Sequence, residues 1–431
     1  MLRVIGVKDF GDLLSGIPRD LRLREFNIGP GMSEMDLLIS LRRIGQRNFH
    51  SDRFASFLGA GAYDHYIPPV VGQLSSRSEF LTAYTPYQGE ASQGTLQTIY
   101  EYQSLMCNLL AMDVSNASVY DGASAAAEAV VLALRHTSRP RVLVPETLHP
   151  ETIETLKTYA GNLPVEFVLL PQKDGVTDLD ILEKQADGRT AAVVLQNPNF
   201  MGFLEDVSRA SEIARKAGAL MIVSVNPLSL GVLEAPGVLG ADIAVGDGQP
   251  LGNPVSYGGP HFGFFAVKEP LMRRLPGRIS GMTVDNKGRR AFVLTLQARE
   301  QHIRREKATS NICTNHALSA LKALIFLTVI GPHGFKRMAE LNVQKSHETL
   351  DILKSVPGVK PYSAAPFFNE FTVRIDKDDE KLKRAFFAQK LIGPLHLGRF
   401  DERWRGLYLV AVTEQRTTDE MERLARAIRD A

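Results

Sequence analysis

The strongest constraint on the fold is a series of short, continuously apolar runs between residues 142 and 267. Stretches with helical periodicity separate one run from the next. A run that is apolar at every position fits a strand buried on both faces, and such burial requires helices above and below the sheet. We therefore predict a three-layer α/β/α domain with a mainly parallel sheet. The runs are VLV (142–144), VEFVLL (165–170), AAVVL (191–195), ALMIVSV (219–225), ADIAV (241–245) and FGFFAV (262–267).

Residues 1–60 are predicted to form an arm of short helices, and the large α/β domain is predicted to span 61–310. In the arm, Ser33 is suited to cap a helix, and Gly45 is suited to follow its last turn. The apolar positions of this helix form one stripe, so we expect the arm to pack against another surface. The stripe consists of Leu37, Leu38, Leu41 and Ile44.

Residues 311–431 are predicted to form a smaller α+β domain. Its strands are expected within 367–375 and 406–412, where apolar and β-branched residues gather. The last helix of the chain is expected to open with Thr417 and Glu420 as a capping box.

Composition and charge argue against several classes of function. The 431 residues include 50 Lys and Arg and 48 Asp and Glu, spread along the chain, with a formal net charge of +2. This balance predicts neither nucleic acid nor a membrane surface as a partner. The two cysteines, Cys107 and Cys313, lack the spacing of a metal site or a disulfide framework. We find no signal peptide and no apolar run of transmembrane length, and expect a cytoplasmic protein without a metal.

A candidate anion site lies at the start of the helix predicted within VYDGASAAAEA (119–129). A turn of small residues at a helix start exposes backbone N–H groups at the positive end of the helix dipole, where a phosphate can bind. The residues concerned are Asp121, Gly122 and Ser124. The alternative is that Asp121 or Ser124 only caps the helix.

Three further polar residues follow the ends of predicted strands. His149 follows the strand at 142–144, Asn226 follows the strand at 219–225, and Gln249 follows the strand at 241–245. Ligands of parallel sheets bind beyond the carboxyl ends of the strands, so these side chains are expected to face one region. The ring of His149 could stack on a planar ligand there, although a lone histidine is more often structural.

Two loops are rich in aromatic and polar residues. The first, within GAGAYDHYIPPVV (59–71), carries Tyr63, His65 and Tyr66, and the second lies within 80–103. Loops of this composition often bind ligands or partners, but solvated turns with buried tyrosines are about as consistent with the sequence. The candidates of the second loop are Tyr84, Tyr87, Gln88 and Glu90.

These features together resemble the glycine cleavage system P-protein, a pyridoxal-phosphate-dependent glycine decarboxylase of fold type I. The resemblance runs from the arm to the end of the chain. More specifically, the chain resembles the amino-terminal half of the P-protein, which some organisms encode as a separate, non-catalytic subunit. The motifs that carry it include YDHYIPPVV (63–71), TAYTPYQGEASQGT (82–95), YDGASAAAEA (120–129), YGGPHFGFFA (257–266) and HIRREKATSNICTN (302–315).

The resemblance implies a cofactor plan from which this sequence departs at two positions. Gln249 lies near the place of the lysine that forms an imine with the cofactor, and Asn226 lies at the place of the aspartate that keeps the pyridine nitrogen protonated. No lysine occurs between Lys216 and Lys268, so a small shift of alignment does not supply one. We therefore expect no cofactor in this chain and regard Asp121, Gly122, Ser124 and His149 as remnants of its pocket.

The resemblance also implies partners. A lysine-bearing second subunit would bind pyridoxal phosphate covalently and decarboxylate glycine, and the lipoyl arm of the H-protein would take up the aminomethyl group. The expected assembly is a heterotetramer with two copies of each subunit. We expect the loops at 63–66 and 84–90 to complete the site of that partner. The alternatives are a purely structural or regulatory subunit with a vestigial pocket, and a free-standing enzyme that uses another lysine.

Overall fold

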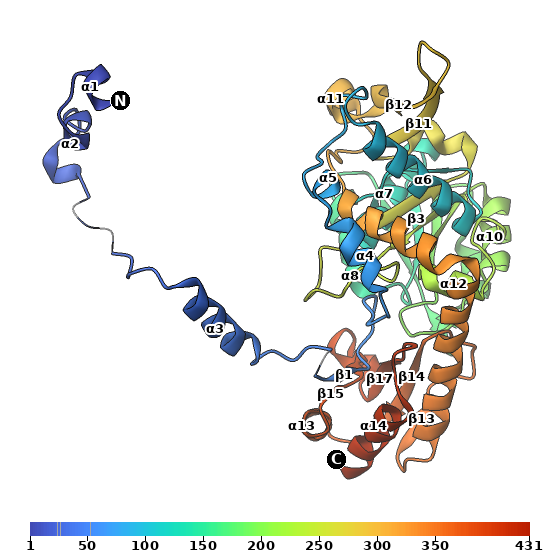
Figure 1. Cartoon of the computed structure of the whole chain (residues 1–431). Helices are drawn as coiled ribbons and strands as arrows, with labels where there is room; N and C mark the ends of the chain where they lie inside the picture. Colours follow the sequence, from blue (N-terminus) through green and yellow to red (C-terminus); the bar gives the residue numbers. More distant parts are fainter. Residues whose placement is uncertain (24, 26, 52) are drawn as a thin grey trace. The chain divides into compact units, whose positions relative to one another are not determined.

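The structure is a computed structural model that describes residues 1–23, 25, 27–51 and 53–431, and it divides into two compact units, Met1–His50 and Ser51–Ala431 (Figure 1). The predicted arm boundary at residue 60 lies inside the second unit, because β1 (Ala55–Ser56) pairs with β15 (Leu391–Ile392). The division of 61–431 into a large and a small domain stays a prediction, since both parts belong to this one unit.

The first unit consists of short helices without a buried core. They are α1 (Leu2–Ile5), α2 (Phe10–Leu13), η1 (Arg19–Leu21) and α3 (Glu34–Gly45), and none of their described residues is buried. Ser33 caps α3 as predicted, because its side chain accepts a hydrogen bond from the Asp36 N–H. Gly45 is the last helical residue and Gln46 is the C-cap, so the predicted position of Gly45 beyond the helix is wrong. The stripe of Leu37, Leu38, Leu41 and Ile44 is exposed within this unit.

A seven-stranded sheet forms the centre of the second unit, and each of the six predicted apolar runs supplies one of its strands. The five strands from β9 to β4 are mutually parallel, whereas β10 is antiparallel to β9 and β2 is antiparallel to β10. In spatial order the strands are β2 (Val114–Ser115), β10 (Gly263–Val267), β9 (Ile243–Asp247), β8 (Leu220–Val225), β7 (Thr190–Asn197), β3 (Arg141–Pro145) and β4 (Glu166–Leu170).

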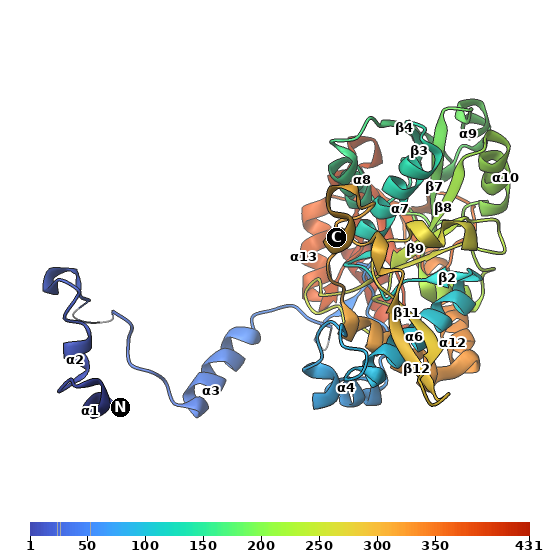
Figure 2. The same cartoon turned by 90° about the horizontal axis from the view of Figure 1, so that it is seen from above.

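Helices cover both faces of this sheet, which confirms the predicted three-layer architecture (Figures 1 and 2). On one face, α7 (Gly122–Thr137) and α8 (Pro150–Ala160) form an apolar core with the strands. On the other face, the core includes side chains of α6 (Gln93–Leu110), α10 (Val207–Ala217) and α12 (Ala317–Lys354). Shorter elements around the sheet are α4 (Pro69–Ser75), α5 (Ser78–Leu81), β5 (Gln172–Lys173), β6 (Val176–Thr177), α9 (Leu179–Gln185), η2 (Pro227–Gly231) and η3 (Glu269–Arg274).

The stretch from 275 to 316 contains a hairpin and short helical turns. The hairpin pairs β11 (Ile279–Val284) with β12 (Arg290–Thr295) in antiparallel register, and both strands pack against α6. The turns are η4 (Gln297–Arg299), α11 (Gln301–Arg304) and η5 (Arg305–Lys307).

The C-terminal part is built on a four-stranded antiparallel sheet in the order β13, β14, β17, β16. The capping box of Thr417 and Glu420 at the start of the last helix is confirmed. This part has its own apolar core, to which Leu353 at the end of α12 contributes. Its elements are β13 (Val359–Pro361), β14 (Glu370–Ile375), α13 (Asp379–Ala388), β16 (Leu395–His396), η6 (Leu397–Arg399), η7 (Glu402–Trp404), β17 (Leu407–Ala411) and α14 (Thr418–Asp430).

One helix, α12, is long and apolar enough to cross a membrane by length and composition, and it is the single such helix in the described part of the chain. Its packing identifies it as a core helix instead. It lies against α4, α6 and η2, and it buries Ala323 and Phe326 completely. It is also interrupted by Gly331, whose φ of 60° and ψ of 179° are not helical, directly before Pro332.

Candidate functional site

A cavity of about 430 Å³ opens at the carboxyl ends of the parallel strands. The ends of β7, β8 and β9 contribute Gln196, Asn226 and Asp247 to its wall, and the start of α7 contributes Asp121 and Gly122. The other wall residues with polar side chains include His149, Glu151, His261, Tyr63 and Glu370. The sheet therefore brings the predicted helix start and two of the three predicted strand-end residues to one place.

Two carboxylates occupy backbone N–H groups at the start of α7. The Asp121 side chain caps the helix by accepting from the Ser124 N–H at 2.7 Å. The Asp247 carboxylate accepts from the Gly122 N–H at 3.2 Å and from the Gln249 N–H at 2.9 Å. A side chain at position 122 would not fit, because its Cβ would lie 2.6 Å from the backbone nitrogen of Asp247. Strand β9 and helix α7 therefore meet closely, with Asp247 between them.

His149 is held in one orientation beside the cavity. It precedes α8, and its Nδ1 accepts from the Glu151 N–H at 3.2 Å. Its Nε2 lies 3.2 Å from the Ala60 carbonyl oxygen, so the neutral ring carries its proton there and donates it. Burial lowers the pKa of His149, which favours this neutral form. The ring also meets Phe200 edge to face, with centroids 4.7 Å apart.

Asn226 and Gln249 serve different structural purposes. The Oδ1 atom of Asn226 accepts from the Leu228 N–H at 3.1 Å, and its buried Nδ2 has no hydrogen-bond partner among the described residues. Gln249 does not line the cavity, contrary to the prediction that it faces the same region. Its side chain accepts from the Tyr63 N–H at 2.9 Å and donates to the carbonyl oxygens of Tyr63 and Asn253, each at 2.8 Å. The side chain nearest the expected lysine position thus fastens a loop.

Glu370 and Asp247 are site residues that the sequence did not indicate. Glu370 accepts from the Ala60 N–H and from the Tyr63 hydroxyl, both at 2.7 Å, and burial raises the pKa of its carboxyl to about 7. Burial also raises the pKa of Asp247, although its two N–H donors and His261 oppose the shift. Asp247 could have been found, because GDG at a strand end places an acid at the carboxyl edge. Glu370 gave no such signal, because it lies 310 residues from Ala60.

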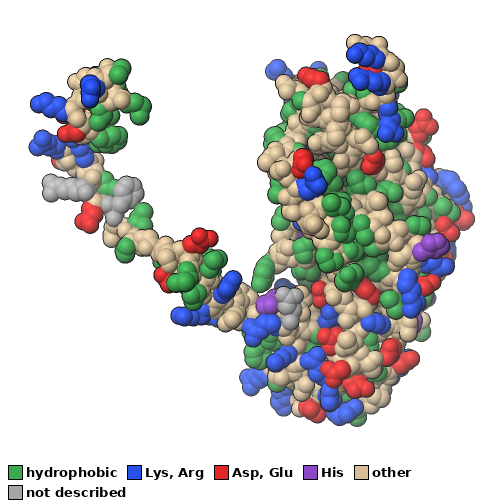
Figure 3. Space-filling view, viewed as in Figure 1, with side chains coloured by type: hydrophobic (Ala, Val, Ile, Leu, Met, Phe, Trp, Pro, Cys, Tyr) green, Lys and Arg blue, Asp and Glu red, His purple; other side chains and the backbone are tan. Residues whose placement is uncertain are grey.

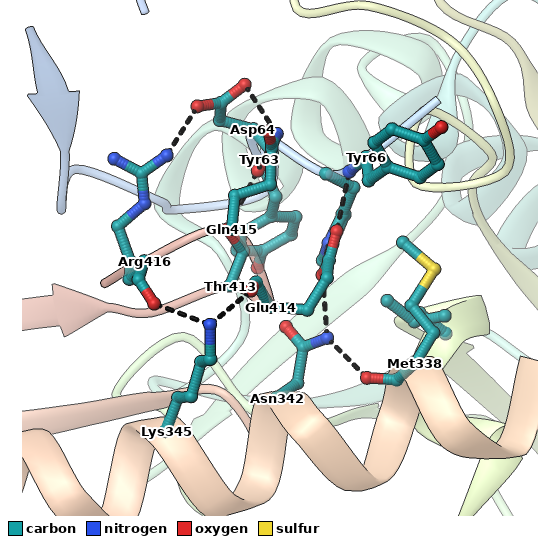
Figure 4. A network of polar contacts seen from close by, with 12 residues as sticks. Tyr63, Asp64, Tyr66, Met338, Asn342, Lys345, Thr413, Glu414, Gln415 and Arg416 are labelled. Atoms are coloured by element: carbon teal, nitrogen blue, oxygen red, sulfur yellow. Dashed lines mark hydrogen bonds and ion pairs between the residues drawn. The ribbon is translucent and has the colours of Figure 1, made fainter. Parts of the chain in front are cut away.

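Glu414 anchors the loop at 63–66 to the C-terminal part (Figure 4). Its carboxylate lies 2.8 Å from His65 Nδ1 and accepts from the Tyr66 N–H at 2.5 Å and from the Asn342 amide at 2.9 Å. Burial would raise the pKa of Glu414, but His65 and these hydrogen bonds hold it below its ordinary value. Beside it, Asp64 forms an ion pair with Arg416 at 2.9 Å.

The same contacts show how the predicted residues of this loop are oriented. Tyr63 and His65 are buried and bonded within the chain, so their side chains do not face outward as a direct role at a partner's site requires. Tyr66 is exposed at the surface. Within this loop, Tyr66 is therefore the aromatic side chain open to an outside contact.

The loop at 84–90 presents its candidate side chains to solvent. Tyr84 is 81% exposed and Tyr87 is 57% exposed, and Gln88 and Glu90 are exposed as well. A turn with buried tyrosines, the alternative interpretation, does not describe this loop. Tyr87 is nevertheless positioned, because its hydroxyl lies 3.0 Å from Arg278 Nη2 and the guanidinium lies over its ring at 5.4 Å.

Comparisons with known proteins agree with this architecture. The family model of the glycine cleavage system P-protein matches residues 1–428. A relative from Carboxydothermus hydrogenoformans, named probable glycine dehydrogenase (decarboxylating) subunit 1, is 47% identical over 429 residues, which cover 99% of this chain and 96% of the relative. A relative of the same name from Endomicrobium trichonymphae is 48% identical over 433 residues, which cover 100% of this chain and 97% of the relative.

A crystal structure of glycine decarboxylase (P-protein) of the glycine cleavage system, in inhibitor-bound form, matches with a TM-score of 0.91 and 44% identity. The match covers 100% of this chain and 97% of that chain. The glutamate decarboxylase of Lactobacillus brevis, at 13% identity and a TM-score of 0.71, shares the fold alone. The full-length match to the family model, together with these relatives, shows that the chain belongs to the glycine cleavage system P-protein family.

Proposed function

We propose that this chain is the non-catalytic subunit of a glycine-decarboxylating complex, and that it supports a second subunit that carries the lysine. The observation that carries the proposal is that position 249, near the expected lysine, holds a glutamine whose side chain is fully used in hydrogen bonds. Gln249 cannot form an imine, and both polar ends of its side chain are used to hold Tyr63 and Asn253. The subunit 1 names of the relatives support a partner subunit and a glycine dehydrogenase reaction for the complex.

The cavity does not suit pyridoxal phosphate, the cofactor that the family and fold imply. That cofactor requires a binding site for its phosphate, an acid beside its pyridine nitrogen and a lysine that forms an imine with it. Here carboxylates occupy two N–H groups at the helix start, and the amide of Asn226 cannot hold the pyridine proton as a carboxylate does. Neither Lys nor Arg is among the described residues that line the cavity. The cofactor of the complex therefore belongs to the partner subunit, where it supplies the decarboxylation chemistry.

The contribution of this chain to that chemistry would come from its exposed loops. Tyr84, Tyr87 and Glu90 are accessible, and Tyr66 is held outward by the Glu414 anchor. Neighbouring chains of this fold commonly complete each other's sites, so we propose that these side chains reach the partner's cofactor site or the path of the lipoyl arm of the H-protein.

The surface of the second unit supports assembly with another chain. Hydrophobic side chains gather over α4, α6 and α12 on the face viewed in Figure 3. Leu74 of α4 and Val329 of α12 are among the exposed apolar residues of the chain. We propose a cytoplasmic heterotetramer with two copies of each subunit. The second candidate function, a purely structural or regulatory subunit, is supported by Tyr63 and His65, whose side chains are buried and bonded within this chain.

The first test is borohydride reduction with pyridoxal phosphate, applied to this chain alone and to the chain mixed with its lysine-bearing partner, followed by mass spectrometry of each polypeptide. An adduct on the partner and none on this chain is expected. A stoichiometric adduct on a lysine of this chain would show that the cofactor has been assigned to the wrong subunit.

The second test separates the two candidate functions through the exposed loop. Tyr84→Phe, Tyr87→Phe and Glu90→Gln are assayed in the assembled complex for exchange between glycine and carbon dioxide. Loss of exchange with the complex intact supports a contribution to the partner's site, whereas unchanged exchange in all three variants favours the structural subunit. Matched controls are Tyr257→Phe, at a tyrosine that is 80% exposed, and Glu212→Gln, at an exposed glutamate outside the loops.

A further inference from the structure

We propose that Asp247 is a built-in anion that occupies the start of α7 and excludes phosphate-bearing ligands from the cavity, as a barrier separate from the missing lysine. This inference concerns the cavity itself and does not depend on which subunit performs catalysis. If it holds, replacing Gln249 by lysine is not enough to give this chain a cofactor.

The first step concerns the supply of hydrogen-bond donors. The opening N–H groups of a helix have no partners within the helix, and they are the groups that bind a phosphate in this type of fold. In α7, the Gly122 N–H donates to Asp247 and the Ser124 N–H donates to Asp121. A ligand phosphate that binds to these two N–H groups would therefore have to displace a carboxylate from each of them.

The second step concerns the position of the Asp247 carboxylate. Its Oδ2 atom accepts from the Gly122 N–H and its Oδ1 atom accepts from the Gln249 N–H, so both carboxylate oxygens are held by backbone donors. The close approach of β9 to the helix start, which leaves no room for a Cβ at Gly122, places the carboxylate directly against the donors. A rotation away from them would cost Asp247 both hydrogen bonds.

The third step concerns charge. The cavity wall contains four carboxyl groups, Asp121, Glu151, Asp247 and Glu370, and neither Lys nor Arg occurs among the wall residues that the structure describes. The basic side chains of the wall are the histidines His149 and His261. The Nδ1 atom of His261 lies 3.8 Å from Asp247 Oδ1. A phosphate placed at the helix start would lie beside the carboxyl groups of Asp121 and Asp247 without a fixed cation to offset its charge.

The test compares pyridoxal phosphate binding by Gln249→Lys with binding by the double variant Asp247→Ser, Gln249→Lys. Binding is followed by absorbance of the bound cofactor and by borohydride reduction with peptide mapping at position 249. We expect the single variant to bind at least about tenfold more weakly than the double variant. Equal, stoichiometric labelling at position 249 in both variants would overturn the role of Asp247, and so would a folded double variant that binds no better than the single variant.

A matched control distinguishes position from overall charge. Glu151→Gln combined with Gln249→Lys removes another wall carboxylate that is not bonded to the start of α7, and it should bind as weakly as Gln249→Lys alone. Equal gains from the Glu151 and Asp247 changes would overturn the proposal, because the exclusion would then come from diffuse charge.

A phosphate titration of variants that keep Gln249 covers the case in which the double variant does not fold. Inorganic phosphate is titrated into the wild-type chain, Asp247→Asn and Asp247→Ser, and followed by ³¹P line broadening. Broadening in the variants and none in the wild type supports the proposal, and equal broadening in all three overturns it. An adduct on a native lysine of the wild-type chain would instead contradict the proposed function and leave the role of Asp247 intact.

Discussion

The pH dependence of stability provides a direct test of the buried cluster at Glu370. This carboxyl is 5% exposed, and burial raises its pKa from an ordinary value of 4.5 to about 7. Between these values the folded chain binds more protons at this position than the unfolded chain does. Stability is therefore lost as the pH rises from about 4.5 to about 7.

The size of the loss follows from the shift. A pKa that rises by about 2.5 corresponds to about 3 kcal/mol in the free energy of unfolding once the pH exceeds 7. Glu370→Gln removes the titration, because the amide is neutral at every pH and still offers an oxygen to the Ala60 N–H and a donor to the Tyr63 hydroxyl. The variant should exceed the stability of the wild type by less than about 1 kcal/mol near pH 5 and by about 3 kcal/mol at pH 8.

Urea unfolding of the isolated chain, followed by the fluorescence of Trp404, measures this difference at each pH. The chain has a single tryptophan, and it is buried in the C-terminal core. Other titrating groups, such as Glu128 with a pKa that burial raises to about 7, cancel between the two proteins. Glu212→Gln, at an exposed position, is the control and should show no trend. A stability difference that stays constant within about 1 kcal/mol from pH 5 to pH 8 would refute the reasoning.

Three further predictions concern packing, an ion pair and thiol reactivity. Gly122→Ala should lower the free energy of unfolding by about 1–3 kcal/mol, because the new Cβ meets backbone at 2.6 Å, whereas Gly94→Ala, with no atom within 4 Å, should not lower it. Arg416→Gln leaves a carboxylate without its cation beside the loop in Figure 4 and should cost about 3 kcal/mol in urea unfolding; a cost below about 1 kcal/mol would contradict the ion-pair argument. Iodoacetamide at pH 8 should label exposed Cys313 before Cys107, whose pKa burial raises to about 11, and mass spectrometry of the two peptides reports the order.

The central sheet could be predicted from the sequence because its strands are buried on both faces. Each strand then needs an apolar residue at every position, which produces a run that is visible without knowledge of its neighbours. Strands of two residues carry no such pattern, so the pairing of β1 with β15 could not be predicted.

The candidate site was predictable only where topology determines it. Parallel strands end at one edge, so Asn226 and the helix start at Gly122 could be placed together from their positions after strands. Glu370 and Glu414 come from the C-terminal part and reach loop residues more than 300 positions earlier in the chain. Such contacts depend on how two packed cores meet, and no local pattern of residues encodes them.

A lysine in place of Gln249 would change the packing of a loop as well as the chemistry of the position. The glutamine side chain accepts from one backbone group of Tyr63 and donates to another, which no ammonium group can do because it only donates. A lysine there would leave the Tyr63 N–H without its acceptor and loosen the loop that also supplies Ala60 to His149 and Glu370. That loop continues into the segment held by Glu414, so Gln249 fixes its backbone at Tyr63 and Glu414 fixes it at Tyr66. The Gln249 side chain therefore holds the loop through two hydrogen bonds to Tyr63, and it is also a group that cannot form an imine.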